Sequence, residues 1–329
     1  MIKNKEVLLK VVDLKKHFIL KKSSFNMLNK KILKAVDGVS FNIFKGETLG
    51  LIGESGSGKT TTAWTIMKLY EPSSGKIYFN DEDITDLSEK EMLPYRKRMQ
   101  MVFQDPYASL NPRMTIGASM REPLRIFSKE TASLQRKKVE SMMEVVELKP
   151  DKYNRYPHQL SGGERQRACI VRALVLNPDL IVCDEAIASL DVSIQAQIVN
   201  LLKKIQNEFK LAYLFISHDL SMVNHISDRI AVMYLGQIVE LAQKEDLIKN
   251  PLHPYTKALI SSIPEVNPEG SLSNNRIILK GEIPSPVNPP SGCCFHTRCP
   301  DVTELCQNRK PEFREVTRGH YVACNKKNL

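Results

Sequence analysis

A glycine-rich loop that ends in a lysine and a threonine is the first group of residues able to do chemistry. Residues 53–60 read Gly-Glu-Ser-Gly-Ser-Gly-Lys-Thr, between an apolar run over Glu47–Ile52 and a helical pattern over Thr60–Lys68. The run is typical of a buried parallel strand. The spacing matches G-x-x-x-x-G-K-[ST], in which backbone N–H groups point at phosphate oxygens and the following helix adds its positive end. We therefore predict a nucleotide site.

Each polar side chain of this loop has an expected role. Lys59 would neutralise the β- and γ-phosphates, and the Thr60 hydroxyl would bind Mg²⁺. A chance match is the alternative, and the strand-loop-helix context disfavours it. The residues predicted to bind nucleotide here are Gly53, Ser55, Gly56, Ser57, Gly58, Lys59, Thr60 and Thr61.

Two adjacent carboxylates follow a second apolar run. Leu180–Cys183 is expected to be a strand, and Asp184 and Glu185 come at its carboxyl end, the edge of an α/β sheet where ligands bind. Asp184 would hold Mg²⁺ through water, and Glu185 would polarise an attacking water as general base. Two acids also end strands at ordinary exposed loops, but together with the phosphate loop they favour catalysis.

The segment Leu160–Arg167 is the most specific in the chain. It reads Leu-Ser-Gly-Gly-Glu-Arg-Gln-Arg and resembles the signature carried by ABC-type ATPases. Ser161 and Glu164 fit a capping box, so a purely structural role is the alternative. We expect Ser161 to cap its helix and also to read phosphate, because a hydroxyl and backbone amides meet at a helix N-terminus. The signature residues predicted to bind nucleotide are Ser161, Gly162, Gly163 and Glu164.

Further elements of the ABC family follow in order along the chain. Gln104, at the end of an apolar strand, matches the glutamine that senses Mg²⁺ and the attacking water. Asp191, in Ser189-Leu190-Asp191, matches a segment that crosses the dimer interface. His218 matches the switch histidine that contacts the γ-phosphate, and Phe18 matches the aromatic that stacks on adenine. The resemblance implies that Glu185, His218 and Gln104 are catalytic.

The mechanism implied by the resemblance uses two ATPase domains that face each other head to tail. Each of two ATP molecules then meets the phosphate loop of one chain and the Ser161-type signature of the other. The sequence departs from the family pattern at Ala186, where a proline is usual, and at Ala188-Ser189, where the usual order is Ser-Ala. The missing proline removes a restraint on φ but no catalytic group.

Finer similarity points to the oligopeptide/dipeptide (and nickel-peptide) importer ATPases, and to their F-type subunit. This resemblance implies a homologous D-type ATPase as partner in a heterodimer, two integral-membrane permease subunits and, indirectly, an extracytoplasmic peptide receptor. The segments that carry it are Leu33–Phe41, Val102–Arg113, Asp191–Gln197 and His253-Pro254-Tyr255-Thr256.

Five of the seven cysteines crowd into the last part of the chain. In a cytosolic protein such a cluster suggests metal before disulfides. The resemblance implies Cys293, Cys299, Cys306 and Cys324 as ligands, with Cys294 as an extra thiol. Four thiolates suit a 4Fe–4S cluster or zinc. Their wide spacing favours iron–sulfur, and reduced, unliganded cysteines remain the third reading.

The bulk composition is that of a folded protein of ordinary type. The chain has 329 residues, of which 42% are hydrophobic and 26% charged. It has neither an apolar run long enough to cross a bilayer nor a signal-peptide pattern at the N-terminus. We therefore expect a peripheral protein at the cytoplasmic face of the membrane, attached through permease subunits.

The net charge of +10 raises a second hypothesis, a soluble ABC ATPase that acts on nucleic acid or ribosomes. A single phosphate loop and the absence of a coiled-coil insertion disfavour it. The only local lysine excess (Lys15-Lys16, Lys21-Lys22 and Lys30-Lys31) is expected in a loop-like insertion. A metal-sensing regulator is weaker still, because no DNA-reading motif accompanies the thiols. We therefore predict no nucleic-acid partner.

The elements that must position these residues alternate between strands and helices, which predicts an α/β core with a mostly parallel sheet. The family resemblance implies a P-loop NTPase of ABC type, with an antiparallel β subdomain and a helical subdomain over about 105–175. Prolines recur after residue 250 and indicate an irregular, turn-rich unit. We predict an ATPase domain over 1–250 and a cysteine-bearing extension over 251–329. Strands are expected at Val7–Phe18, Ala35–Ile43, Gln100–Phe103 and Ala212–Ile216, and helices within 112–148 and 194–209.

Overall fold

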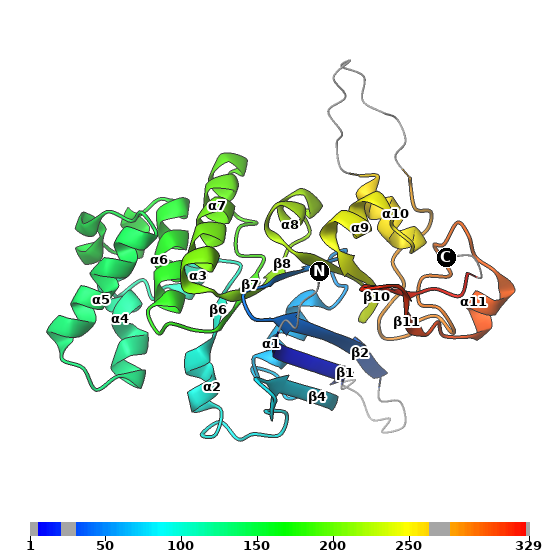
Figure 1. Ribbon diagram of the computed structural model, residues 1–329, viewed down its shortest axis with the longest axis horizontal. Helices are drawn as coiled ribbons and strands as arrows, with labels where there is room; N and C mark the ends of the chain where they lie inside the picture. The colour runs from blue at the N-terminus through cyan, green and yellow to red at the C-terminus, as the bar shows by residue number, and fades with distance from the viewer. Residues whose placement is uncertain (1–5, 21–30, 263–276, 327–329) are drawn as a thin grey trace, which may run out of the picture. The chain divides into compact units, whose positions relative to one another are not determined.

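The computed structural model describes residues 6–20, 31–262 and 277–326 (Figure 1). The chain forms two compact units, each assembled from separate stretches of sequence. The first consists of Met1–Leu8, Ile43–Thr48 and Asp86–Ser217, and the second of Leu9–Asn42, Leu49–Thr85 and His218–Leu329. We describe them one at a time.

The first unit contains three parallel strands, β6 (Met99–Val102), β7 (Leu180–Asp184) and β8 (Ala212–Ile216). β7 pairs with both neighbours, and Asp184 lies opposite Ile216 in the register. Every residue of β7 and β8 is buried, which explains their uniformly apolar sequences. The parallel register brings the carboxyl ends of these strands to one edge.

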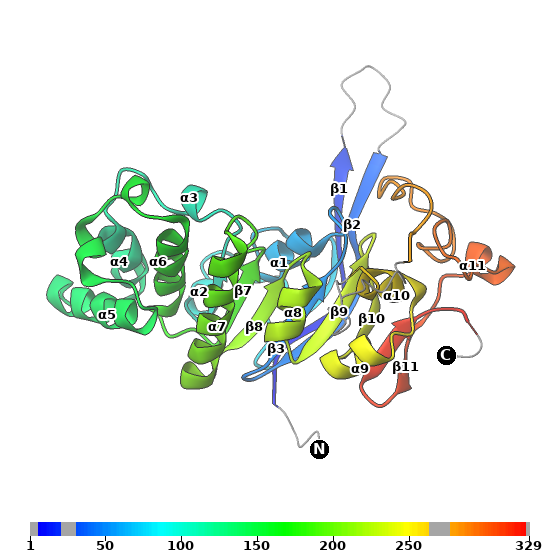
Figure 2. The same ribbon diagram turned by 90° about the horizontal axis from the view of Figure 1, so that it is seen from above.

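The helices of the first unit form a cluster of α4 (Ile116–Phe127), α5 (Ala132–Val145) and α6 (Gly162–Leu174), which pack on one another (Figures 1 and 2). Val139 and Met143 are buried on α5, as the three- and four-residue spacing of its apolar positions predicts. The remaining helices of this unit are α2 (Leu93–Arg98), α3 (Pro106–Ser109), the 3₁₀ turns η1 (Pro150–Asn154) and η2 (Pro157–Gln159), and α7 (Val192–Phe209).

The second unit contains an antiparallel sheet in the order β2-β1-β4-β5. Its strands are β1 (Val7–Leu20), β2 (Lys31–Phe44), β4 (Ser74–Phe79) and β5 (Glu82–Asp83), and Figure 2 shows β1 beside β2. Lys15 and Lys16 belong to β1 and not to a loop, which corrects that expectation: the pairing of β1 with β4 continues to Lys15. Lys31 likewise belongs to a strand, as the first residue of β2, and the rest of the expected insertion at 15–31, residues 21–30, lies outside the described residues.

The other sheet of the second unit has the order β11-β12-β10-β9-β3. β3 (Thr48–Ile52) and β9 (Arg229–Tyr234) are parallel, whereas β10 (Gln237–Gln243), β12 (His320–Ala323) and β11 (Phe313–Thr317) pair antiparallel. Two strands near the carboxyl end of the chain thus extend the sheet that carries β3. The helices of this unit are α1 (Lys59–Ile66), α8 (Leu220–Ile226), α9 (Lys244–Lys249), α10 (Pro254–Ile260) and α11 (Glu304–Asn308).

Of the helices in the described part of the chain, none combines the length and the apolar character that crossing a membrane requires.

Candidate nucleotide site

The phosphate loop connects β3 to α1, as the sequence predicts. Two of its glycines are required by close backbone contacts. A Cβ on Gly58, whose φ is +105°, would lie 2.2 Å from the Ala35 carbonyl oxygen, and one on Gly53 would lie 2.1 Å from the Met233 carbonyl oxygen. Because no side chain fits at either point, glycine lets the loop lie directly against the backbones of β2 and β9.

Lys59 folds back over the loop from the first position of α1. Its Nζ donates hydrogen bonds to the carbonyl oxygens of Gly53 (2.8 Å) and Glu54 (3.1 Å), and the residue is only 5% exposed. Within the described residues, Ser57 Oγ is buried and has no hydrogen-bond partner. α1 starts after Gly58, which has no side chain to cap the helix. Backbone donors, an ammonium and a buried hydroxyl thus meet here, which fits the phosphates of a nucleotide.

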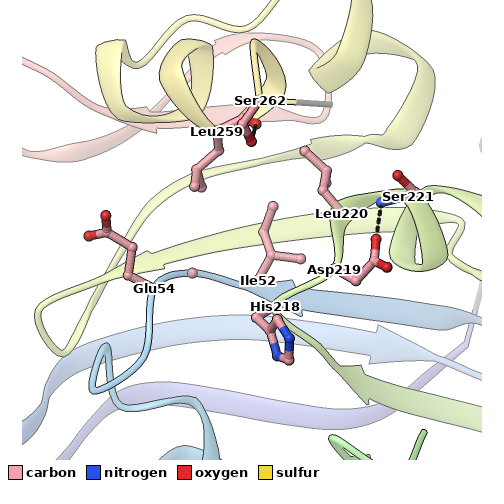
Figure 3. A pocket seen from close by; sticks show the side chains of 9 residues that line it. Ile52, Glu54, His218, Asp219, Leu220, Ser221, Leu259 and Ser262 are labelled. Carbon is pink, nitrogen blue, oxygen red and sulfur yellow. Dashed lines mark hydrogen bonds between the residues drawn. The ribbon is translucent and has the colours of Figure 1, made fainter. Parts of the chain in front are cut away.

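A cavity of about 530 Å³ lies beside the start of this loop (Figure 3). It is lined by Ile52–Glu54, by His218–Ser221 at the start of α8, and by Leu259 and Ser262 at the α10 end. Asp219 Oδ1 accepts hydrogen bonds from the N–H groups of Ser221 (2.8 Å) and Met222 (3.2 Å) and so caps α8. The structure therefore brings Gly53 and His218 to one cavity of a size typical of ligand sites. His218 and the Glu54 carboxylate point in different directions within it (Figure 3).

Gln104 and Glu185 meet in the first unit. Gln104 Nε2 donates to Glu185 Oε2 over 2.8 Å, and the neighbouring Asp184 is 4% exposed at the end of β7. Glu185 has a left-handed φ of +47° and its N–H donates to the Ile216 carbonyl oxygen (3.0 Å). Because the backbone turns at Glu185, the two neighbouring acids have different surroundings. Asp184 is buried at the end of β7, whereas the Glu185 carboxylate accepts a hydrogen bond from the Gln104 side-chain amide.

The signature begins α6 with the capping box that the sequence predicts. Ser161 Oγ accepts from the Glu164 N–H (3.3 Å), and Glu164 Oε2 accepts from the Ser161 N–H (2.9 Å). Burial raises the pKa of Glu164, but hydrogen bonds from the Ser161 backbone and from Lys152 outweigh it and lower the pKa below its ordinary value. A Cβ on Gly163 would lie 2.9 Å from Ile194 Cγ2. The signature thus lies against the start of α7, which the exposed Asp191 precedes.

Phe18 lies on β1 within a small aromatic group of the second unit. Its ring meets Tyr70 edge to face at 5.4 Å, and Tyr70 also contacts Trp64 of α1 at 5.3 Å. Lys16 Nζ is 5.0 Å from the centre of the Phe18 ring. The predicted adenine-stacking residue is therefore connected through Tyr70 to the helix that follows the phosphate loop.

The four cysteines predicted as ligands line one small cavity of about 20 Å³, together with His253 and Phe295. Cys294 instead lines a separate cavity of about 200 Å³. Burial raises the pKa of Cys293 and of Cys299 to about 11. The donor chemistry suits iron–sulfur or zinc, but over residues 6–20, 31–262 and 277–326 no three His, Cys, Asp or Glu side chains lie close enough to hold a metal ion.

The structure adds two contacts to the loop that the sequence reasoning missed. Arg298 Nη1 and Nη2 donate to the Glu54 carboxylate (2.7 and 3.1 Å), and the Glu54 N–H donates to Tyr255 Oη (2.9 Å). Tyr255 belongs to the segment His253–Thr256, which the sequence singled out only as a family hallmark. No local pattern indicates a contact across so many residues.

Two family models match the chain. The ABC transporter model matches residues 36–188, and a model described as the oligopeptide/dipeptide transporter C-terminal region matches residues 239–306. The first covers the phosphate loop and the signature, and the second begins within β10. The fold and the site therefore define a P-loop ATPase of the ABC class.

Individual relatives are similar over nearly the whole chain. The oligopeptide transport ATP-binding protein AppF of Bacillus subtilis is 52% identical, and the dipeptide transport ATP-binding protein DppF of Haemophilus influenzae is 46% identical, each over 98% of this chain and 98% of its own length. The ATP-binding cassette MJ0796, solved as a dimer in a post-hydrolysis state with ADP and Pi, is 28% identical, with a TM-score of 0.65 over 72% of this chain and 99% of that chain.

The chain belongs to the family of oligopeptide and dipeptide ABC transporter ATP-binding proteins. The family and fold class predicted from the sequence are thereby confirmed. The chain is an ATP-binding and ATP-hydrolysing protein of this class.

Proposed function

We propose that this chain is the motor subunit that powers uptake of oligopeptides or dipeptides through an ABC importer. The observation that carries the proposal is the occurrence of both ABC phosphate readers on one chain, the loop Gly53–Thr60 and the capped signature at Ser161, joined to the peptide-transporter C-terminal region. The names of relatives such as AppF and DppF supply the substrate class.

We propose a division of labour among the site residues, in keeping with the family resemblance. Lys59 and the loop N–H groups bind the β- and γ-phosphates, and His218 contacts the γ-phosphate from the cavity that it shares with Gly53. Thr60, Asp184 and Gln104 are the residues that would hold Mg²⁺, which when bound stabilises negative charge on the phosphate oxygens. Glu185 orients and deprotonates the attacking water, and its bond from Gln104 sets the direction of the carboxylate. Phe18 stacks on the adenine.

The assembly we propose is a heterodimer with a homologous D-type ATPase, beneath two integral-membrane permease subunits and served by an extracytoplasmic receptor. Ser161, Gly162, Gly163, Glu164 and Asp191 would then contact the nucleotide bound by the partner. MJ0796 forms a dimer, and CbiO1 of Clostridium perfringens is part of the transporter complex cbiONQ. The chain would lie at the cytoplasmic face of the membrane, bound to the permeases.

We propose further that the ATPase domain spans 1–250, with its helical subdomain at about 105–175, and that the extension spans 251–329. Within the extension, Cys293, Cys299, Cys306 and Cys324 would bind a 4Fe–4S cluster, with zinc or free thiols as the other outcomes. Their shared cavity supports one common ligand, although their described spacing is not that of a metal site. The absorbance spectrum and metal content of the anaerobically purified chain distinguish the three.

The Glu185→Gln variant tests the proposed function in the assembled transporter. We expect it to bind ATP with unchanged affinity, because the phosphate loop is intact. Hydrolysis and peptide uptake should fall by at least about a hundredfold, because the general base is lost. Asp179→Asn, which removes a carboxylate just before β7, is the matched control and should leave hydrolysis near the wild-type rate.

Two results would contradict the proposal. Near-normal ATP turnover by Glu185→Gln would show that Glu185 is not the general base. Salt-sensitive binding of DNA or RNA by the purified chain, without co-purifying membrane subunits, would favour the nucleic-acid hypothesis that the charge of +10 raised.

A further inference from the structure

Every backbone and side-chain polar group of Glu54, the second residue of the phosphate loop, is engaged. Its N–H donates to Tyr255 Oη (2.9 Å), and its carbonyl oxygen accepts from Lys59 Nζ and from the Ser57 N–H (both 3.1 Å). Its carboxylate accepts two hydrogen bonds from Arg298 (2.7 and 3.1 Å). Glu54 therefore ties the loop to two segments that lie far along the chain.

The Glu54–Arg298 pair is partly shielded from water. The Arg298 side chain is 8% exposed and that of Glu54 27% exposed, so solvent screens this pair less than an ordinary surface ion pair. The guanidinium also lies over the Tyr234 ring, 5.9 Å from its centre. The planar fork of arginine holds a carboxylate at two points, so the pair fixes direction as well as distance.

Arg298 lies within the turn between Cys293 and Cys299. Backbone hydrogen bonds inside the turn run from the His296 N–H to the Cys293 carbonyl oxygen (3.1 Å) and from the Arg298 N–H to the Phe295 carbonyl oxygen (3.0 Å). The Cys293 N–H donates to the Cys306 carbonyl oxygen (2.8 Å), which ties the turn to α11. The backbone conformation of this turn therefore sets the position of Arg298.

The ring of Phe295 anchors the same turn. It is fully buried, with its centre 5.2 Å from that of Tyr234 and 5.4 Å from that of Tyr255. Tyr255 is also the residue that binds the Glu54 N–H. A change in the cysteine turn would therefore reach Glu54 at two points, through Arg298 and through Tyr255.

We propose that Arg298 is a positioning residue for the phosphate loop, and that the Cys293–Cys299 turn sets the affinity for ATP through the Arg298–Glu54 pair. The carbonyl oxygens of Gly53 and Glu54 hold Lys59, so releasing Glu54 lets the loop and the Lys59 ammonium relax away from the phosphates. Arg298 itself acts only through Glu54. The inference rests on the proposed function, since it requires Gly53–Thr60 to bind ATP.

The test begins with binding of Mg-ATP to the purified full-length chain. Arg298→Ala should weaken binding about tenfold, a factor within the reach of one charge-assisted hydrogen-bonded pair. The affinity of Arg298→Lys for ATP should lie between those of the wild type and Arg298→Ala, because lysine keeps the charge but cannot hold the carboxylate at two points. The exposed Arg318, in the same extension, is the matched control, and Arg318→Ala should bind as the wild type does.

A double-mutant cycle shows whether the pair acts as a unit. Glu54→Gln combined with Arg298→Ala should bind ATP no more weakly than Arg298→Ala alone. Cys299→Ser should weaken binding in the wild-type chain and have a smaller effect in the Arg298→Ala chain, where only the route through Tyr255 is left. In the assembled transporter, Arg298→Ala should raise KM for ATP and leave kcat within about twofold, because the pair acts on binding and not on the chemical step.

A single outcome of this series would be enough to overturn the inference. Arg298→Ala binding ATP like the wild type, or strictly additive effects in the cycle, would show that the pair does not position the loop. If single variants fold poorly because one charge is left buried, Glu54→Leu with Arg298→Met removes both charges and must still bind weakly. A wild-type chain that binds no ATP would instead contradict the proposed function.

Discussion

His253 is a buried histidine whose ring accepts a hydrogen bond that requires the neutral form. Its Nδ1 accepts from the Tyr255 N–H (3.1 Å) at the start of α10, and the backbone N–H of His253 donates to Glu240 Oε2 (2.9 Å). Burial lowers the pKa of His253 from 6.5 to about 4. Protonation would remove the acceptor that caps α10, so this residue links the stability of the segment to pH.

The sign of the linkage follows from the depressed pKa. Between pH 6.5 and about 4 the unfolded chain binds the proton and the folded chain does not, so the free energy of unfolding falls as pH falls. From this pKa difference, His253 lowers the free energy of unfolding by about 3 kcal/mol in total across the window. We expect the melting temperature to decrease across this window, and His253→Asn, which keeps a capping acceptor but does not titrate, to show a smaller decrease.

The comparison isolates His253 because every other ionisable side chain is common to the wild type and the His253→Asn variant. His158→Asn, at an exposed site, is the control and should keep the wild-type slope. An equal slope in wild type and His253→Asn would show that His253 is not the titrating group.

The sequence alone predicts the interaction partners of some site residues but not of others. The chemistry of Lys59 and of the Ser161–Glu164 capping box follows from local spacing, because their partners lie within a few residues. The partners of Glu54 could not be predicted, since Arg298 lies 244 positions away. Only the fold brings such pairs together.

At the scale of elements, we expect the Ser161 hydroxyl both to cap α6 and to contact the phosphate of a nucleotide. Ser161 and Thr131 both cap helices, α6 and α5, by accepting a backbone N–H (3.3 and 3.4 Å). Replacing either with alanine should cost about 1 kcal/mol of stability. Only Ser161→Ala should also lower ATP hydrolysis in the assembled complex, by more than its loss of stability explains, because Thr131 lies outside the site.

Melting curves and ATPase rates of the two variants check this prediction together. Equal ATPase rates for Ser161→Ala and Thr131→Ala would show that Ser161 only caps its helix and does not contact phosphate.

Expected strands that are buried at every residue match the structure closely, but burial alone does not make a strand predictable, since β9 and β10 are also mostly buried. The expected strand Ala212–Ile216 coincides with β8, and Leu180–Cys183 is one residue shorter than β7, because strands buried on both faces have short, uniformly apolar sequences. β9, β10 and β12 were not predicted. The pairing of β12 with β10 joins residues as distant as Glu240 and Val322, and the proline-rich sequence before β12 indicates only irregular structure.

At the scale of the whole molecule, each chain carries one phosphate loop and one signature, in different compact units. If the signature of this chain completes the partner's site, defects in the two elements must inactivate different nucleotide sites. Lys59→Ala should remove the ATP held by this chain's own loop. Ser161→Arg should remove the ATP held by the partner, because a long side chain at the start of α6 keeps its backbone N–H groups away from phosphate.

We expect the assembled wild-type complex to retain two molecules of a non-hydrolysable ATP analogue after rapid gel filtration, since two composite sites close around two nucleotides. Each single variant should retain one, and Lys59→Ala combined with Ser161→Arg in the same chain should retain none. If both substitutions affected the same site, the double variant would retain as much of the ATP analogue as either single variant. That result would mean that the loop and the signature of one chain act on one nucleotide, and it would exclude the head-to-tail arrangement.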